Sequence, residues 1–196
     1  MEKISLKAGT LLSPLPPVMV SCGTMEKPNI ITIAWTGIIN SQPPKTYISV
    51  RKSRYSYDII KESGEFVINL TTADLVRAAD LCGVKSGRDV DKFALCNLNP
   101  QASEKISAPA IEEAHLCLEC VVTKVEELGS HDMFMADIVN VRADSSLMDK
   151  NGRLALEKSD LVAYAHGEYY ALGKKLGKFG FSVQKKKKHH KKTWKT

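Results

Sequence analysis

Short hydrophobic segments alternate with short polar segments along most of the chain, which is typical of a protein built mainly from β-strands. Residues 18–22 and 30–39 are apolar and rich in β-branched side chains, and the polar segment 23–29 between them contains Gly and Pro. These three segments predict a β-hairpin. The prolines at 43–44 end its second strand because proline cannot donate to a sheet. A third strand is predicted over 47–50.

The spacing of apolar residues then becomes helical for a short distance. Tyr55, Ile59 and Ile60 fall on one helical face, and Gly64 suits a C-terminal cap. The segment 65–70 returns to the strand pattern. We therefore expect a short helix that leads directly into a strand.

A second helix and a long hairpin are predicted further along. Thr71 and Asp74 have the spacing of a capping box, and Gly83 could close the helix that follows. The segments 116–127 and 133–141 are apolar and separated by a polar turn with a glycine, so they predict a hairpin.

The predicted elements add up to about six strands and two or three short helices. The strands connect mostly as hairpins, without a regular alternation of strand and helix. We therefore expect a mainly β fold, an antiparallel barrel with helices inserted between strands. The length of 196 residues suits one domain, assigned to residues 1–182, with a basic tail at 183–196.

The net charge of +6 comes from that tail. Of the 28 basic residues, seven lysines lie in 185–196, which leaves 21 basic residues against 22 acidic ones. A self-repelling run of this kind is expected to be disordered and solvated. Its lysines could contact nucleic acid, but nucleic-acid-binding domains usually show a basic face on the folded part. We therefore do not expect nucleic acid as a partner.

Membrane, disulfide and metal chemistry are not predicted. No apolar run approaches the roughly 20 residues of a membrane span, and the first ten residues lack a secretory pattern, so we expect a cytoplasmic protein without a membrane partner. The five cysteines do not suggest a disulfide framework. Cys117 and Cys120 have CxxC spacing, but on a strand their side chains point to opposite faces. We expect no metal site.

Three polar clusters are candidates for binding. The segment 50–57 contains three cations and several hydroxyls at a strand-to-helix junction, which could hold a phosphate or could be an exposed turn with a Ser cap. The segment 32–36, continued by 40–41, could line a groove or be a strand with a packed Trp. The segment 86–93 could belong to a site or be a solvated loop with local ion pairs. Generic catalytic motifs are missing, which suits a protein whose chemistry is carried by a cofactor.

Taken together and in order, these clusters resemble the flavin reductase-like family of FMN-binding split barrels, and within it flavoredoxins and related flavin reductases. The resemblance extends from about residue 14 to 182. It is carried by the segments 27–35, 40–44, 53–56, 63–70, 86–93, 131–134, 167–173 and 179–182.

The resemblance implies a six-stranded split barrel that forms a homodimer, with FMN in a groove near the interface. It implies that Ala34, Trp35 and Thr36 lie along the flavin, with backbone groups reaching the ring edge. It also places Asn40 and Ser41 at the ribityl chain or the phosphate.

The second cluster of site residues implied by the resemblance surrounds the FMN phosphate. Three side chains would hold the phosphate directly, and three more would lie nearby. The direct contacts are Arg51, Ser53 and Ser56, and the neighbours are Lys52, Arg54 and Tyr55.

The remaining implied residues surround the ring. Lys92 and Phe93 would close over the flavin, and Lys92 could stabilise the anionic reduced ring. His166, Tyr169 and Tyr170 would lie near the ring, contributed either by the same chain or by the partner subunit. The sequence singles out no catalytic residue.

Two functions of the flavin remain open, beside the nucleic-acid alternative. In the first, the protein is an FMN-dependent oxidoreductase that takes electrons from NADH or NADPH as co-substrate. In the second, it is an electron carrier without direct nicotinamide activity. In both, the electron acceptor is a small molecule or a protein.

Overall fold

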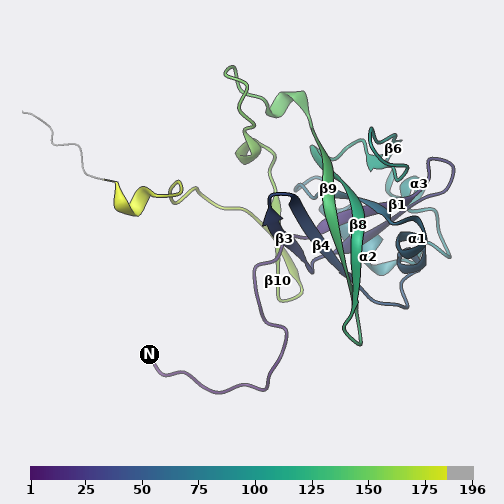
Figure 1. Ribbon diagram of the computed structural model, residues 1–196. Helices are drawn as coiled ribbons and strands as arrows, with labels where there is room; N and C mark the ends of the chain where they lie inside the picture. Colours follow the sequence, from purple (N-terminus) through teal and green to yellow (C-terminus); the bar gives the residue numbers. More distant parts are fainter. Residues whose placement is uncertain (185–196) are drawn as a thin grey trace, which may run out of the picture.

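The computed structural model describes residues 1–184, and its centre is a seven-stranded antiparallel sheet in the order β2-β1-β5-β8-β9-β4-β3 (Figure 1). Its strands are β1 (Val18–Gly23), β2 (Pro28–Ile33), β3 (Thr36–Ser41), β4 (Pro44–Val50), β5 (Glu65–Leu70), β8 (Leu116–Glu127) and β9 (Asp132–Ala143). The predicted mainly β, antiparallel fold is confirmed. Most of the predicted tail, residues 185–196, lies outside the described residues.

The connection between β2 and β3 closes the sheet. These strands lie at opposite edges of the strand order, yet only Ala34 and Trp35 separate them in sequence. The Trp35 carbonyl accepts a 2.9 Å hydrogen bond from the Ser49 amide of β4, which fixes the crossing. The chain thus passes directly from one edge to the other, as in a barrel split along one seam. The predicted continuous strand 30–39 is therefore two strands, and the sheet has seven strands instead of six.

Within residues 1–184, three α-helices cover the barrel: α1 (Tyr55–Ser63), α2 (Val76–Val84) and α3 (Lys92–Cys96). The predicted first helix is confirmed, and Gly64 caps it with a φ of 69°. The predicted capping box is wrong, because α2 begins only at Val76. Thr72 forms a bridge with Leu161, and hydrogen-bonded turns over residues 73–75 lead from it into α2.

Alternating residues of the strands build two apolar layers. Val20, Ile48 and Phe66 face the barrel interior, whereas Met19 and Val67 pack outward beneath α2 and α3. The same alternation separates the two cysteines of the CxxC segment. Cys120 belongs to the interior layer and Cys117 to the outer one, which confirms the prediction that they point to opposite faces.

Smaller elements complete the described chain. They are two short hairpins and three short 3-10 helices, namely β6 (Pro100–Gln101) with β7 (Ala110–Ile111), β10 (Val162–Ala165) with β11 (Glu168–Ala171), η1 (Ser145–Leu147), η2 (Leu156–Lys158) and η3 (Phe181–Val183). None of the described helices is long and apolar enough to cross a membrane.

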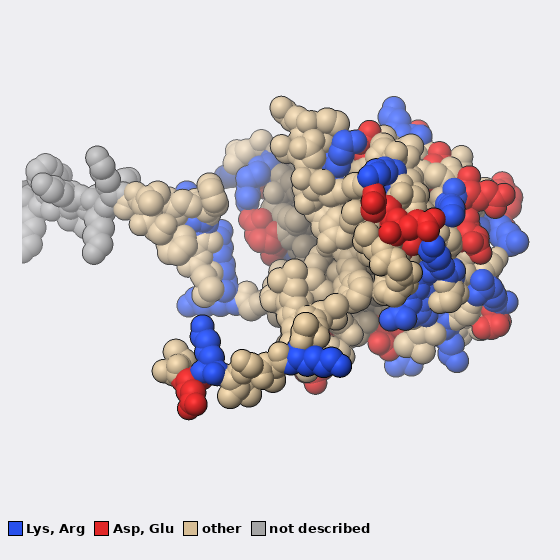
Figure 2. Space-filling view, turned by 60° about the horizontal axis from the view of Figure 1, so that its bottom comes forward, with Lys and Arg blue, Asp and Glu red and all other residues tan. Residues whose placement is uncertain are grey.

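Two extended arms leave the barrel. Residues 1–13 and 172–184 depart on the side of β3 and β10 (Figure 1). In Figure 2, the charged side chains gather mainly on the part of the barrel away from these arms, whereas the part nearest to them is largely uncharged. The arms therefore adjoin a comparatively uncharged part of the surface.

Candidate functional site

A groove beside the β2–β3 crossing consists of two adjoining cavities of about 340 and 430 Å³. Ile31, Arg51 and Arg54 line both cavities and so connect them. Cofactor sites usually occupy about 300–1,000 Å³. The combined groove is large enough for a cofactor of the size of a mononucleotide.

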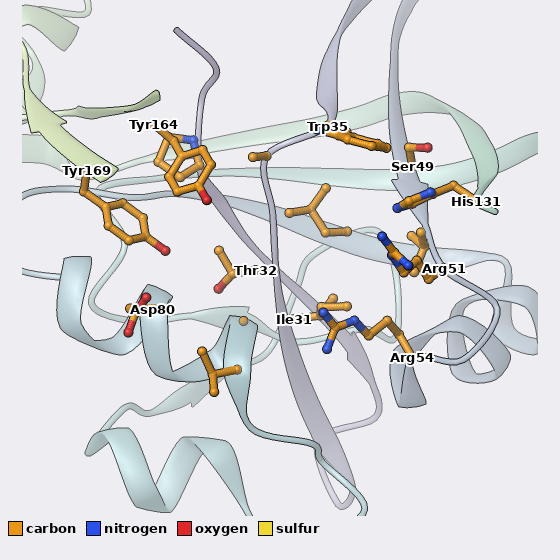
Figure 3. Close-up of a pocket in the computed structure, with 16 residues that line it drawn as sticks. Ile31, Thr32, Trp35, Ser49, Arg51, Arg54, Asp80, His131, Tyr164 and Tyr169 are labelled. Carbon is orange, nitrogen blue, oxygen red and sulfur yellow. The ribbon is translucent and has the colours of Figure 1, made fainter. Parts of the chain in front are cut away.

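Aromatic side chains form the walls of the first cavity, here called the aromatic half. Trp35 and His131 lie on one side of it, and Tyr164 and Tyr169 lie on the other (Figure 3). The Trp35 and His131 ring centroids are 4.5 Å apart, and the two tyrosine rings meet edge to face at 5.2 Å. Because aromatic faces favour stacking, this half suits a flat ring system.

Two titratable groups in the aromatic half are held in their uncharged forms near neutral pH. Burial, with Arg51 and Arg54 nearby, lowers the pKa of His131, so its imidazole stays neutral. Burial and the neighbouring Asp80 raise the pKa of Tyr169 to about 12, so its phenol keeps its proton. The Tyr169 hydroxyl therefore stays protonated beside the Asp80 carboxylate.

The second cavity, here called the anion half, is lined by five cationic side chains and no carboxylate. Arg51 and Arg54 come from the β4–α1 junction, Lys85 and Arg88 from the loop after α2, and Lys92 from α3. Arginine can bind phosphate oxygens with two parallel hydrogen bonds. A cavity with this lining is suited to an anion such as a phosphate group.

The N-terminus of α1 adds backbone donors to the anion half. Arg54 is the residue before the helix, and its side chain does not cap the first turn. The Tyr55 and Ser56 amides have no partner within the helix. Both residues line the cavity, so the positive end of the helix dipole lies beside it. The alternative of a Ser cap at this turn is not what the structure shows, since Arg54 occupies the cap position.

Two buried side chains also contribute donors. Ser56 accepts a 2.7 Å hydrogen bond from the Asn29 amide group, which leaves its own hydroxyl proton free to donate. Lys92 is only 5% exposed, and its ammonium donates to the carbonyls of Ile30 and Cys82 at 2.7 and 2.8 Å. Burial lowers the pKa of Lys92. An ammonium has three N–H groups, so one remains for a ligand.

Gly87 allows the loop after α2 to close tightly over this half. A Cβ atom there would lie 2.1 Å from the Asn29 side-chain oxygen and 2.8 Å from the Tyr55 ring. The adjacent Arg88 lies 5.4 Å from the centre of the Tyr55 ring and donates to the Ser53 carbonyl. The absence of a side chain at 87 therefore lets this loop meet α1.

Nine of the sixteen predicted site residues line the groove. They are Ala34, Trp35, Arg51, Ser53, Arg54, Tyr55, Ser56, Lys92 and Tyr169. Tyr169 does so within its own chain, without a partner subunit. Lys92 lies in the anion half instead of beside the aromatic slot.

Three predicted residues are turned away because other contacts hold them. Thr36 is buried, and its hydroxyl donates to the Tyr47 carbonyl. Phe93 is 3% exposed and packs in the apolar layer beneath α2 and α3, so it does not close over the groove. Lys52 forms ion pairs with Glu127 and Asp132 at 3.0 and 3.5 Å.

The other four predicted residues are exposed beyond the groove walls. Asn40 and Ser41 lie at the far end of β3, where the Asn40 side chain donates to Pro43. His166 occupies the β10–β11 turn with a φ of 52°. The Tyr170 hydroxyl donates a hydrogen bond to the Glu168 carboxylate. Because alternate residues of β11 face opposite sides, Tyr169 faces the groove and Tyr170 does not. A flavin contact by these four residues stays a prediction.

Other groove residues were not predicted as site residues. They include Pro17, Ile31, Thr32, Ser49, Asp80, Gly83, Lys85, Ser86, Gly87, Arg88, His131 and Tyr164. Some had a local signal, since residues 86–88 belong to the third polar cluster and 131 to a family-like segment. Asp80 and Tyr164 had none, because only the packing of α2 and β10 brings them to the groove.

An aromatic slot joined to a cationic pocket on a split barrel suits a planar, anionic ligand. Residues 11–173 match the flavin reductase like domain, so the chain belongs to this family. Among the residues that the structure describes, no group of three or more His, Cys, Asp or Glu side chains is placed to hold a metal ion.

Solved structures and curated relatives agree with this assignment. Flavoredoxin of Desulfovibrio vulgaris (Miyazaki F) is 36% identical and superposes with a TM-score of 0.86, covering 93% of this chain and all of that one. Flavoredoxin from Methanosarcina acetivorans is 28% identical with a TM-score of 0.84, covering 94% of this chain and all of that one. The FMN reductase (NADH) RutF of Pseudomonas syringae pv. syringae is 26% identical over 55% of this chain and 58% of its own length. The resemblance to flavoredoxins is thus confirmed.

Proposed function

We propose that this chain binds FMN in the groove and works as a flavin-dependent oxidoreductase. The observation that carries the proposal is the direct junction of the aromatic half with the anion half through Ile31, Arg51 and Arg54. The isoalloxazine ring of FMN is flat and its phosphate is anionic, so its two ends match the two halves. The names of the flavoredoxin and FMN reductase relatives support the same ligand.

The residues of the anion half would hold the phosphate. Arg51 and Ser53 supply side-chain donors from the β4–α1 junction, and the start of α1 supplies backbone donors. Ser56 and Lys92 supply buried donors whose orientation is already fixed by Asn29 and by two backbone carbonyls. Such pre-oriented donors lose little freedom on binding.

The residues of the aromatic half would orient the ring and set its surroundings. Bound flavin supplies the redox chemistry, accepting and releasing electrons without a protein nucleophile. Trp35 would pack against the ring from one side of the slot, and Tyr169 would line the other side. Arg51 and Arg54 add positive charge between the two halves, which favours the more negative reduced state of a bound ring.

The two functions left open by the sequence differ in the electron donor that reduces the flavin. In the reductase, NADH or NADPH would reach the open slot and give its electrons to the flavin. The flavin would then pass them to a small-molecule or protein acceptor. For the carrier, only another redox partner reduces the protein. The RutF similarity favours the reductase, and the flavoredoxin similarity is compatible with either.

Anaerobic mixing of FMN-loaded protein with NADH and, separately, NADPH distinguishes these functions. Bleaching of the flavin absorbance within seconds by either nucleotide supports the reductase. Dithionite serves as the control that the flavin is reducible. Bleaching by dithionite but by neither nucleotide contradicts the reductase and leaves the carrier.

We also propose that the protein works as a homodimer. The two arms expose large apolar side chains that a single chain leaves in water: Ile4, Leu6, Leu11, Leu12, Leu172, Leu176, Phe179, Phe181 and Val183. Both arms leave on the same side of the barrel (Figure 1), which suits two copies that wrap around each other. Burial of this surface would favour association because apolar side chains gain free energy on leaving water.

A further inference from the structure

Two cysteines lie side by side at the wall of the anion half. Cys82, in the last turn of α2, lines the cavity, and Cys96 is the last residue of α3. Their sulfurs are 3.8 Å apart. A disulfide bond measures about 2.05 Å, so the sulfurs need to approach by less than about 2 Å to form one.

The two thiols differ in access to solvent. Cys82 is 1% exposed, and burial, with Cys96 beside it, raises its pKa to about 12. Cys96 is partly exposed at the end of its helix. A small oxidant therefore reaches Cys96 first, and Cys82 is positioned as the second thiol.

We propose that Cys82 and Cys96 form a reversible disulfide in response to hydrogen peroxide, and that this disulfide weakens ligand binding in the anion half. In the first step, the Cys96 sulfur attacks one peroxide oxygen, the O–O bond breaks, and one water leaves with a thiol proton. In the second step, the Cys82 sulfur attacks the resulting sulfenic acid of Cys96, and the Cys82 thiol proton passes to the departing hydroxide. The S–O bond breaks and a second water leaves, so two thiols and one peroxide give one disulfide and two waters.

Lys92 connects this pair to the groove. It lies in α3 with Cys96, and its ammonium donates to the Cys82 carbonyl at 2.8 Å. Pulling the ends of α2 and α3 together would change this contact. It would also move Lys85, which follows Cys82 along the chain and lines the same cavity. The binding part of the inference rests on the proposed FMN site, whereas disulfide formation does not.

Peptide mapping tests the disulfide. Reduced full-length protein is treated with hydrogen peroxide, free thiols are alkylated, and the peptides are identified by mass spectrometry. We expect a cross-linked Cys82–Cys96 peptide that dithiothreitol removes. Cys117→Ser is the matched control, because Cys117 is buried in the same apolar layer, and it should keep the cross-link. Peroxide that leaves both thiols free, oxidises Cys96 only to sulfinic acid, or joins other cysteines overturns the proposal.

FMN titration of the oxidised and reduced proteins tests the coupling. We expect oxidation to raise the Kd for FMN by at least about threefold in the wild-type protein. Peroxide should leave the Kd of Cys96→Ser unchanged, with circular dichroism confirming that this variant is folded. Equal affinities of the oxidised and reduced wild-type protein overturn the coupling. Failure of the reduced protein to bind FMN contradicts the proposed function and the coupling with it, while the mapping still decides the disulfide.

Discussion

The Trp35 and His131 rings lie 4.5 Å apart, centroid to centroid, and are tilted by 39°. Trp35 belongs to the crossing between β2 and β3, and His131 precedes β9 in the turn after β8. The Trp35 side chain is nevertheless 38% exposed, so His131 covers only part of the indole. The pair forms one wall of the aromatic half and leaves indole surface for a ligand.

Replacement of Trp35 by Ala should weaken FMN and riboflavin binding to a similar extent. Loss of one aromatic packing contact is worth about 0.5–1.5 kcal/mol, or roughly two- to tenfold in Kd. Because Trp35 is partly exposed, the free energy of unfolding should fall by less than about 1 kcal/mol. Flavin fluorescence titration and urea unfolding measure the two effects, with Trp35→Phe as the conservative control. Unchanged affinity for both flavins would remove Trp35 from the ring site.

The His131 pKa predicts a pH effect on stability. Burial and the nearby Arg51 and Arg54 lower this pKa in the folded chain from the ordinary value of 6.5. The unfolded chain then takes up the proton at a higher pH than the folded chain, so the free energy of unfolding falls as the pH drops below 6.5. In His131→Asn this part of the decrease should disappear. Urea unfolding between pH 5 and 8 compares the proteins, and identical pH profiles would contradict the assignment.

Replacement of Arg51 and Ser53 by Ala should weaken FMN binding more than riboflavin binding. Riboflavin lacks the phosphate, and a hydrogen bond to a charged group contributes about 1.5–3 kcal/mol, which corresponds to roughly 10- to 100-fold in Kd. Arg77→Ala is the control, because Arg77 is exposed on α2 and lines neither cavity. Equal losses for both flavins would place Arg51 and Ser53 outside the phosphate site.

Gly87→Ala should damage the anion half specifically. The added methyl group would meet the Asn29 side chain, which orients Ser56, and the Tyr55 ring. We expect a loss of about 1–3 kcal/mol in the free energy of unfolding together with weaker FMN binding. Gly173→Ala is the matched control, since nothing lies within 4 Å of a Cβ atom there. A Gly87→Ala protein with normal stability and affinity would show that the loop does not close as described.

Deletion of residues 1–10 should weaken self-association. This segment contributes the exposed Ile4 and Leu6 side chains but lines neither half of the groove. Sedimentation equilibrium should show a dimer for the full chain and a higher dimer dissociation constant for the deletion. A full chain that stays monomeric at micromolar concentrations would contradict the dimer.

The sequence predicts the individual strands and helices better than it predicts the closure of the sheet into a barrel. The hairpin signals, the helix before Gly64 and the long 116–141 hairpin all appear in the structure because each depends on neighbouring residues. The break at Ala34 and Trp35 does not show in the pattern, since isoleucines and a threonine typical of strands lie on both sides of it. It depends on β4, whose Ser49 amide holds the Trp35 carbonyl.

For the site too, the sequence predicts the residues that are clustered along the chain but not those that tertiary packing brings together. Arg51, Ser53 and Arg54 are clustered in sequence, so their role could be predicted from local chemistry and family resemblance. Lys92 and Phe93 are adjacent in sequence but are held by different contacts, the first by two carbonyls and the second by the apolar layer. Only tertiary packing decides which of two such neighbours reaches a groove.

Titration of flavin-free protein with FMN tests the central claim most directly, because it asks whether the two halves of the groove hold one ligand together. The account predicts saturation at one FMN per chain and a lower affinity for riboflavin. It also predicts that heating the loaded protein releases FMN and not FAD. A protein that is folded by circular dichroism but takes up no FMN would contradict the account.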